Sequence, residues 1–168
     1  AEEKQRQKEL FLKQLKLALE LDKPLMIHCR PSKDTEDSHE DMLELLFAHS
    51  RELENKGGTE KLRGAIHFFT GSASVAARYI ELGFYISLPG VITFARELKD
   101  MVVSLPLTSI LAETDYPYAT PVPFRGQRNE PTYVREVVSK IAEMRGEDKS
   151  VVEGAVLSNT SLVFKLGA

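Results

Sequence analysis

The stretch "SILAETDYPYATP", residues 109–121, decides the fold class. Its apolar run "ILA" predicts a short buried strand, and this run stops at Glu113-Thr114-Asp115. Two carboxylates at the mouth of an apolar strand repel each other unless a positive group lies between them. A bound cation at this strand end would remove the repulsion between Glu113 and Asp115.

Three earlier segments predict strands of the same kind: "LMIHC" (25–29), "GAIHFF" (64–69) and "FYISLPG" (84–90). Helical periodicity and capping signals predict helices over about 2–21, 38–57, 72–83, 94–103 and 131–146, and from about 150 onward. This alternation predicts parallel strands joined by right-handed helical crossovers. Four such strands form either a small open α/β sheet or half of a (β/α)8 TIM barrel, for which about 250 residues is typical.

The bulk composition predicts one domain, residues 1–168, with ordinary shares of hydrophobic (42%) and charged (28%) residues. No apolar run approaches the roughly 18 residues that a membrane span requires. The charged opening "AEEKQRQKEL" predicts no secretory signal, and the single cysteine suits a reducing compartment, so we expect a cytoplasmic protein without membrane partners. The net charge of −3 means that any affinity for nucleic acid must come from a local basic patch.

Three of the predicted strands end on potential metal ligands, namely His28, His67 and Asp115. The carboxyl ends of parallel strands meet at one rim, where active sites of α/β folds form. Imidazole nitrogen and carboxylate oxygen suit Zn²⁺, Mn²⁺ or Mg²⁺. Glu113, one pleat before Asp115, is predicted to orient a ligand rather than to bind metal itself. The alternative is that the two histidines are core or rim residues with no ligand.

Strand alternation and helix context predict the surroundings of four neighbouring residues. Cys29 points away from the His28 face and is predicted to be buried filler. Arg30 returns to the His28 face, where it either meets a phosphate or forms a salt bridge. His39 and His49 fall among charged residues of a helix and are predicted to be solvated.

The loop after the last predicted strand, residues 116–131, combines prolines with aromatic and arginine side chains. Its prolines restrict the unfolded chain and favour a preformed surface. Tyr116 offers a flat ring, and Arg125 and Arg128 offer forked donors for phosphate oxygens. Rings interleaved with arginines are typical of single-stranded nucleic-acid platforms, although a rigid cover without a ligand has the same composition.

At "PLMIHCR", "GAIHFFTGS", "YISLPGVITF", "LAETDYPY" and "RGQRNEP" the chain resembles the TatD family of metal-dependent deoxyribonucleases. The resemblance implies an amidohydrolase-like barrel that uses one or two divalent ions, Mg²⁺, Mn²⁺ or Zn²⁺, to hydrolyse phosphodiester bonds of DNA. Exonuclease cleavage of single strands in the 3′-to-5′ direction is one form of that activity. The resemblance also implies that His28, His67 and Asp115 bind metal, and that Arg125 and Asn129 frame the substrate. Asp115 would also act in catalysis by orienting or deprotonating the attacking water.

The chain departs from the family pattern because the family's opening Asp-x-His-x-His motif and its metal-bridging glutamate have no counterpart. We therefore expect the C-terminal half of a barrel, strands five to eight, with weak metal binding and little activity alone. Its partner would be the N-terminal half-barrel, or a second copy that pairs with the exposed strand edges. Two rival functions are hydrolysis of another ester or amide, and an inactive module that serves only in association.

Overall fold

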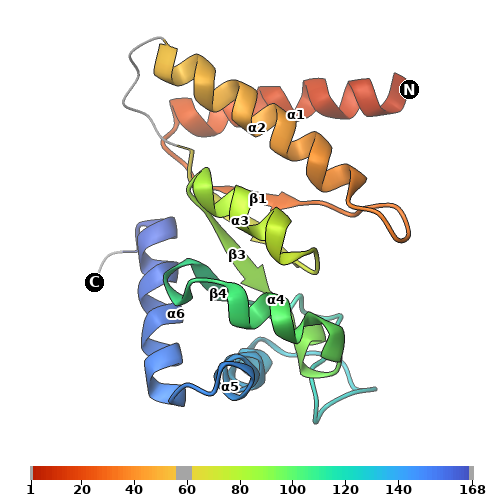
Figure 1. The fold of residues 1–168 in the computed structure, drawn as a ribbon, viewed down its shortest axis with the longest axis vertical. Coiled ribbons are helices and arrows are strands. Elements are labelled where there is room, and N and C mark those ends of the chain that lie inside the picture. Colours follow the sequence, from red (N-terminus) through yellow and green to blue (C-terminus); the bar gives the residue numbers. More distant parts are fainter. Residues whose placement is uncertain (1, 56–61, 167–168) are drawn as a thin grey trace.

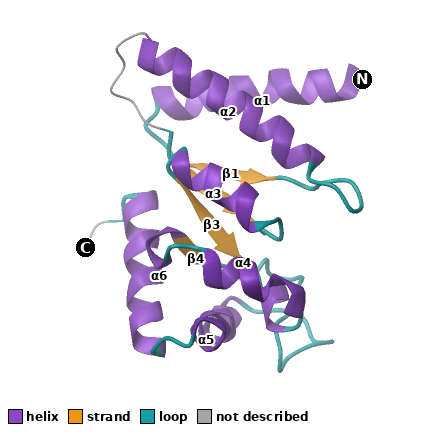
Figure 2. Cartoon of the chain, viewed as in Figure 1, coloured by secondary structure: helices purple, strands orange, loops and turns teal. Residues whose placement is uncertain are grey.

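A computed structural model describes residues 2–55 and 62–166 as an α/β fold (Figure 1). Its helices and strands are α1 (Glu2–Glu20), β1 (Leu25–His28), α2 (Asp37–Asn55), β2 (Gly64–His67), α3 (Ala73–Glu81), β3 (Phe84–Leu88), α4 (Lys99–Ser104), β4 (Ile110–Ala112), α5 (Val134–Arg145) and α6 (Lys149–Phe164). Four parallel strands form one sheet in the order β1-β2-β3-β4, with the helices arranged around it (Figure 2). The predicted alternation of elements and the parallel sheet are confirmed.

One helix is shorter than its pattern predicts. The segment expected to be helical from Phe94 follows the 3₁₀ turn η1 (Gly90–Thr93), contains a second 3₁₀ turn, η2 (Arg96–Leu98), and becomes α-helical only at Lys99. The Thr93 hydroxyl donates to the Gly90 carbonyl oxygen (2.7 Å) and accepts from the Val122 amide (2.9 Å), so this segment is tied to a distant loop. The predicted end of the second helix, near residues 57–58, lies outside the described residues.

Glycines act at two element boundaries. Gly146 ends α5 in the left-handed conformation (φ 66°), as predicted. Gly64 starts β2 beside Leu25, where an added Cβ would lie 2.0 Å from the Leu25 carbonyl oxygen. Only glycine therefore allows β1 and β2 to pair from their first residues.

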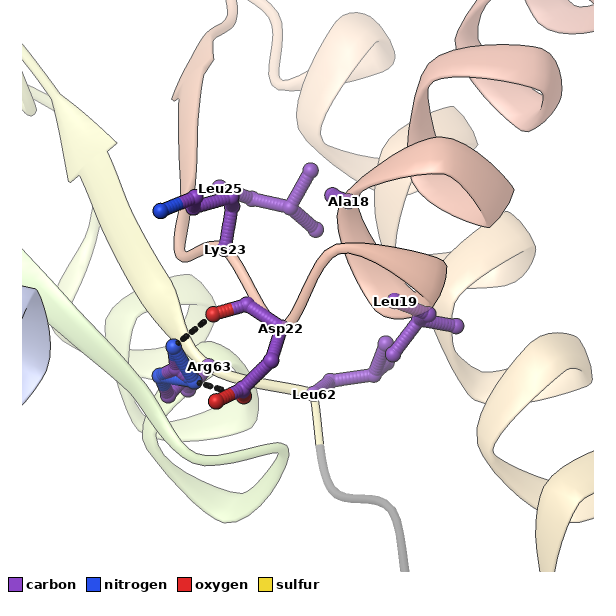
Figure 3. A pocket seen from close by; sticks show the side chains of 7 residues that line it. All are labelled: Ala18, Leu19, Asp22, Lys23, Leu25, Leu62 and Arg63. Carbon is purple, nitrogen blue, oxygen red and sulfur yellow. Dashed lines mark hydrogen bonds and ion pairs between the residues drawn. The ribbon is translucent and has the colours of Figure 1, made fainter.

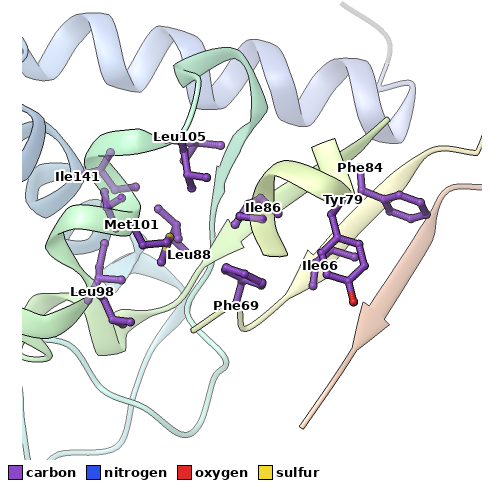
Figure 4. Close-up of a cluster of buried hydrophobic side chains, with 14 of the residues drawn as sticks. Ile66, Phe69, Tyr79, Phe84, Ile86, Leu88, Leu98, Met101, Leu105 and Ile141 are labelled. Atoms are coloured by element: carbon purple, nitrogen blue, oxygen red, sulfur yellow. The ribbon is translucent and has the colours of Figure 1, made fainter. Parts of the chain in front are cut away.

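One face of the sheet packs against the helices and forms the main core (Figure 4). Ile27, Ile66, Ile86 and Ile110 contribute one side chain from each strand, and all four are buried. Figure 4 shows Ile66, Tyr79, Phe84 and Ile86 on one side of this core and Leu98, Met101, Leu105 and Ile141 on the other. At about 25 cal/mol per Å² of apolar surface, burial of this face is the main favourable term for folding.

The opposite face of the sheet is only partly covered. Val163 and Phe164 of α6 pack on Ala65, Leu111 and Tyr85 in a smaller apolar cluster. Met26 of β1, on the same face, is 62% exposed. Along the described residues β1 and β4 each pair with one strand only, so both outer edges of the sheet are open.

Asp22 holds the amino end of the sheet together (Figure 3). Arg63 donates to the Asp22 carboxylate (2.8 Å) and to its backbone carbonyl, and Lys165 forms an ion pair with the same carboxylate. These cations hold the pKa of the exposed Asp22 carboxyl below its usual range, with the Lys165 contact as the largest cause. The small cavity at this junction lies at the starts of β1 and β2, at the opposite end of the strands from His28 and His67.

None of the helices in the described ranges is both long enough and apolar enough to cross a bilayer.

Candidate metal centre

Strand register brings the predicted ligands onto one face at one rim. His28 is paired with His67 across β1 and β2. The register of β3 and β4 places Ser87 beside Leu111. Because side chains alternate along each strand, Ser87 shares the face of His67, and Glu113 follows Leu111 on that face. The apolar runs therefore end with their polar side chains side by side.

His67 lies at the middle of this group. Its ring centroid is 5.6 Å from that of His28, with the planes tilted by 47°. Its Nε2 atom lies 3.5 Å from Oδ1 of Asp115, and its Nδ1 atom lies 2.9 Å from Oε2 of Glu113. His28 and Asp115 thus both lie next to His67, and the three predicted ligands converge at one rim.

Glu113 decides which nitrogen of His67 can bind a cation. When the Nδ1–H group donates to the Glu113 carboxylate, a neutral ring keeps its lone pair on Nε2. This lone pair then faces the Asp115 carboxylate across 3.5 Å. A metal cation between these two electron-rich atoms would bind to both of them.

Glu113 is held by three donors. Besides His67, the Phe68 amide donates to Oε1 (2.9 Å) and the Ser87 hydroxyl donates to Oε2. Burial raises the pKa of the Glu113 carboxyl above its usual value, although the hydrogen bonds from Ser87, His67 and Phe68 oppose this effect. The predicted role of Glu113 as the residue that orients a ligand agrees with this geometry. Ser87 was not predicted, and its only signal was a polar residue inside an apolar strand.

The backbone turns sharply after β2 and after β4, two of the three strands that end on candidate ligands. Phe68 and Asp115 adopt left-handed conformations, with φ of 53° and 54°. Asp tolerates this region, but a bulky aromatic residue does so at a cost of order 1–3 kcal/mol. Two hydrogen bonds hold the turn in place: the Phe68 amide donates to the Glu113 carboxylate, and the Phe69 amide donates to the Ser87 carbonyl oxygen (3.1 Å). Strain held in this way beside candidate ligands is typical of functional sites.

The donor types fit a divalent metal, whereas the ligand shell is incomplete. Two imidazoles and a carboxylate match Zn²⁺, Mn²⁺ or Mg²⁺ chemistry. In residues 2–55 and 62–166, however, no group of three or more His, Cys, Asp or Glu side chains lies close enough to hold an ion by itself. His28 is exposed on the open edge strand β1, so this side of the site has room for further ligands.

Arg30 lies on this open side of the site, beside His28. It is exposed and lines a surface cavity together with His28 and Cys29. No described residue forms a salt bridge with its guanidinium, so the salt-bridge alternative has no support within residues 2–55 and 62–166. Contact between Arg30 and a phosphate stays a prediction.

The loop after β4 presents one aromatic-arginine pair beside the site. Tyr116 directly follows Asp115 and is 47% exposed. The Arg128 guanidinium lies 5.1 Å from the centre of the Tyr116 ring and donates to its hydroxyl. This pair offers a ring face and a cation at the edge of the candidate centre, as predicted for a substrate platform.

Two other predicted substrate residues have structural partners. Arg125 lies over the Phe94 ring (4.0 Å) and donates to the Thr120 carbonyl oxygen (2.9 Å), which leaves only part of its guanidinium for a ligand. Asn129 is fully buried; its amide donates to the carbonyl oxygens of Thr114 and Tyr118. A buried side chain cannot touch substrate, so the prediction for Asn129 needs correction. Asn129 holds the loop closed behind Asp115.

The prediction for His39 was wrong. The side chain is buried, with Nδ1 3.2 Å from the Tyr79 hydroxyl and its ring against Phe69. His49 also has only 10% of its side chain exposed, so it is not a solvated residue. Cys29 packs against the main core with Sγ 3.7 Å from the Tyr79 hydroxyl, which agrees with its predicted filler role.

Comparison with known proteins gives a consistent family assignment. The sequence matches the family described as TatD related DNase over residues 1–165. It is 37% identical to the uncharacterized metal-dependent hydrolase YabD of Bacillus subtilis, over 95% of this chain and 58% of that protein. It is 33% identical to the 3′-5′ ssDNA/RNA exonuclease TatD of Klebsiella pneumoniae, over 95% of this chain and 58% of that protein.

Solved structures agree on the fold. The crystal structure of YjjV, a TatD homolog from Escherichia coli K12, superposes with a TM-score of 0.82 at 32% identity, over 97% of this chain and 58% of that one. An uncharacterized amidohydrolase from Saccharomyces cerevisiae superposes with a TM-score of 0.78 at 19% identity, over 96% and 60% of the two chains, which shows the fold alone. The chain spans a little under two thirds of the length of the relatives it matches. The α/β fold is thus TIM-barrel-like, and the chain belongs to the TatD related DNase family.

Proposed function

We propose that the rim of His28, His67 and Asp115 belongs to a metal-dependent hydrolase that cleaves phosphodiester bonds of nucleic acid, with single-stranded DNA degraded from its 3′ end. The single observation that carries this proposal is the alignment of His67 Nε2 with the Asp115 carboxylate, enforced by Glu113. Relatives named metal-dependent hydrolases, and one named a 3′-5′ ssDNA/RNA exonuclease, support the reaction class.

We further infer that the four strands are the C-terminal half of an eight-stranded barrel. The chain spans 58% of the relatives' lengths, both outer strands of the described sheet have open edges, and Met26 exposes an apolar side chain on the partly covered face. A second set of strands would cover these edges and supply the ligands that the described residues lack. On this basis we expect the chain alone to bind metal weakly and to show little activity.

The residues at the rim would have different roles in hydrolysis. His28, His67 and Asp115 would hold one or two divalent ions, and a bound ion supplies Lewis acidity and a water of lowered pKa. Glu113 keeps the His67 ring in the orientation and tautomer that exposes Nε2. Asp115 would orient the attacking water and accept its proton.

The loop residues contribute substrate binding. Tyr116 and Arg128 present a ring and a forked cation directly after Asp115. A base can stack on the ring while the guanidinium binds a phosphate oxygen. Arg30, whose guanidinium pairs with no residue of the described ranges, would make a second phosphate contact beyond His28.

Cleavage assays test the proposal. The chain, combined with the complementary half of a barrel, is incubated with 3′-labelled and 5′-labelled single-stranded DNA, with and without Mn²⁺. We expect metal-dependent shortening from the 3′ end that is lost in His67→Ala, with His49→Ala as a histidine control outside the rim. Faster turnover of a phosphotriester or an amide than of DNA would instead support the alternative hydrolase.

One observation favours a second candidate, an association module without catalysis: the described residues hold no complete ligand group. Metal analysis of the assembled barrel separates the two functions. An ion bound in stoichiometric amount and lost on His67→Ala would exclude the module. Absence of bound metal in the assembled barrel would refute the hydrolase.

A further inference from the structure

A further cavity lies away from the metal rim, between the turns η1 and η2, the start of α4, and α5. It has a volume of about 520 Å³, within the range of about 300–1,000 Å³ that is usual for ligand sites. Its lining includes Thr93 at the end of η1, Phe94 directly after it, Arg96 of η2, Lys99 at the start of α4, and Lys140 and Glu143 of α5. Three cations and one carboxylate thus face the same space.

The positive charge of this cavity is mostly unneutralised. Lys140 donates to the Glu143 carboxylate (2.7 Å), which cancels one charge of each sign. Arg96 and Lys99 are both exposed, and within residues 2–55 and 62–166 neither forms a hydrogen bond or an ion pair through its side chain. By contrast, Arg63, Arg78 and Arg145 each pair with a carboxylate. The cavity therefore favours an anion.

The cavity wall is joined to the loop that carries Tyr116 and Arg128. Thr93 accepts a hydrogen bond from the Val122 amide (2.9 Å), and Arg125 lies over the Phe94 ring (4.0 Å). Gly90 approaches the loop so closely that an added Cβ would lie 2.5 Å from the Ala119 carbonyl oxygen. The cavity wall and the loop of residues 116–131 are therefore in direct contact.

We propose that this cavity binds the phosphates of a single-stranded nucleic acid whose scissile end lies at His67 and Asp115. The inference rests on the proposed function and extends it from the scissile bond to the body of the strand. Arg96 and Lys99 bind successive phosphates, and Phe94, which is 41% exposed, offers a ring edge for a base. A nucleic acid fits better than an acidic peptide because two ring–guanidinium pairs, Tyr116 with Arg128 and Phe94 with Arg125, offer ring faces or edges beside cations.

Binding measured without catalysis tests this proposal. Fluorescence anisotropy of a labelled oligo-dT of about 15 nucleotides is recorded in EDTA for the full chain and for the double variant R96A/K99A. We expect about tenfold weaker binding at low salt for the variant, because two phosphate contacts are lost. The slope of log K against log salt should fall in magnitude by about 1.4, since each phosphate contact on a single strand contributes about 0.7.

The double variant K13A/K16A is a matched control. Lys13 and Lys16 have the same sequence spacing and are exposed on α1, and within the described ranges no carboxylate forms an ion pair with either. We expect this variant to bind the oligonucleotide as the unmodified chain does, although its net charge changes equally. Equal loss in both variants, or no loss in R96A/K99A, would overturn the proposal.

Competition and cleavage separate the remaining outcomes. Polyglutamate that displaces the oligonucleotide as well as unlabelled oligo-dT does at equal charge would assign the cavity to an acidic protein and overturn the proposal. If the assembled barrel fails to cleave DNA in Mn²⁺, the proposed function fails, while the binding difference between the two double variants stays measurable.

Discussion

The Glu113 carboxylate and the His67 ring form the contact that organises the candidate centre, with Oε2 and Nδ1 2.9 Å apart. The contact joins β4 to β2 across β3, whose Ser87 donates to the same carboxylate oxygen. Through this contact Glu113, without binding a metal itself, would determine which nitrogen of His67 binds the metal.

Glu113→Gln tests this relationship. The amide keeps the size of the side chain, but it can present an N–H group to His67 and so disturb the tautomer. We expect metal affinity to fall about 10–100-fold, as for other partners that orient a ligand. Calorimetric titration with Mn²⁺ measures the change, and Glu130→Gln on the exposed loop is the control. Unchanged affinity in Glu113→Gln would remove Glu113 from the site.

Asn129→Ala distinguishes a structural role from substrate contact. The substitution leaves the partly buried carbonyl oxygens of Thr114 and Tyr118 and the Glu130 amide without their partner. At about 1–3 kcal/mol for a buried polar group left unsatisfied, we expect a loss of about 3 kcal/mol in the free energy of unfolding. Urea denaturation measures this loss. A variant of normal stability that binds DNA poorly would restore the substrate role predicted from sequence.

Sequence patterns predicted the backbone well because apolar runs and caps are local signals. The runs before His28, His67 and Glu113 marked three strands, and their shared rim followed from parallel topology. The predictions for His39 and Asn129 needed the tertiary structure. His39 lies among charged residues in the sequence, yet its ring meets Tyr79, forty residues away, and Asn129 is buried by the loop that it closes.

His39 should make the free energy of unfolding depend on pH. Burial lowers the pKa of the His39 imidazole below its usual 6.5, although Glu36, Glu40 and Asp37 act in the opposite direction. The folded state therefore binds the proton less readily than the unfolded state. The stabilisation is present above about pH 6.5 and is lost as pH falls through the folded-state pKa.

The variant His39→Gln isolates this effect, because glutamine can bond to the Tyr79 hydroxyl without titrating. We expect the free energy of unfolding of the unmodified chain to fall more between about pH 7.5 and pH 5.5 than that of His39→Gln. Carboxylates contribute equally to both proteins and cancel in the difference. Parallel pH profiles for the two proteins would contradict the assignment.

Met26→Glu tests the open edge of β1. Met26 is 62% exposed, and Leu17 and Leu21 of α1 are 47% and 57% exposed, all on the lining of one surface cavity. An apolar edge strand recruits further strands, and a charge on it opposes such pairing. Without the complementary half, we expect the chain to elute above its 18.9 kDa mass in a concentration-dependent way. Met26→Glu should shift it toward that mass, whereas Val103→Glu on α4 should not. Light scattering coupled to size exclusion gives the masses, and a monomeric unmodified chain at all concentrations would refute this expectation.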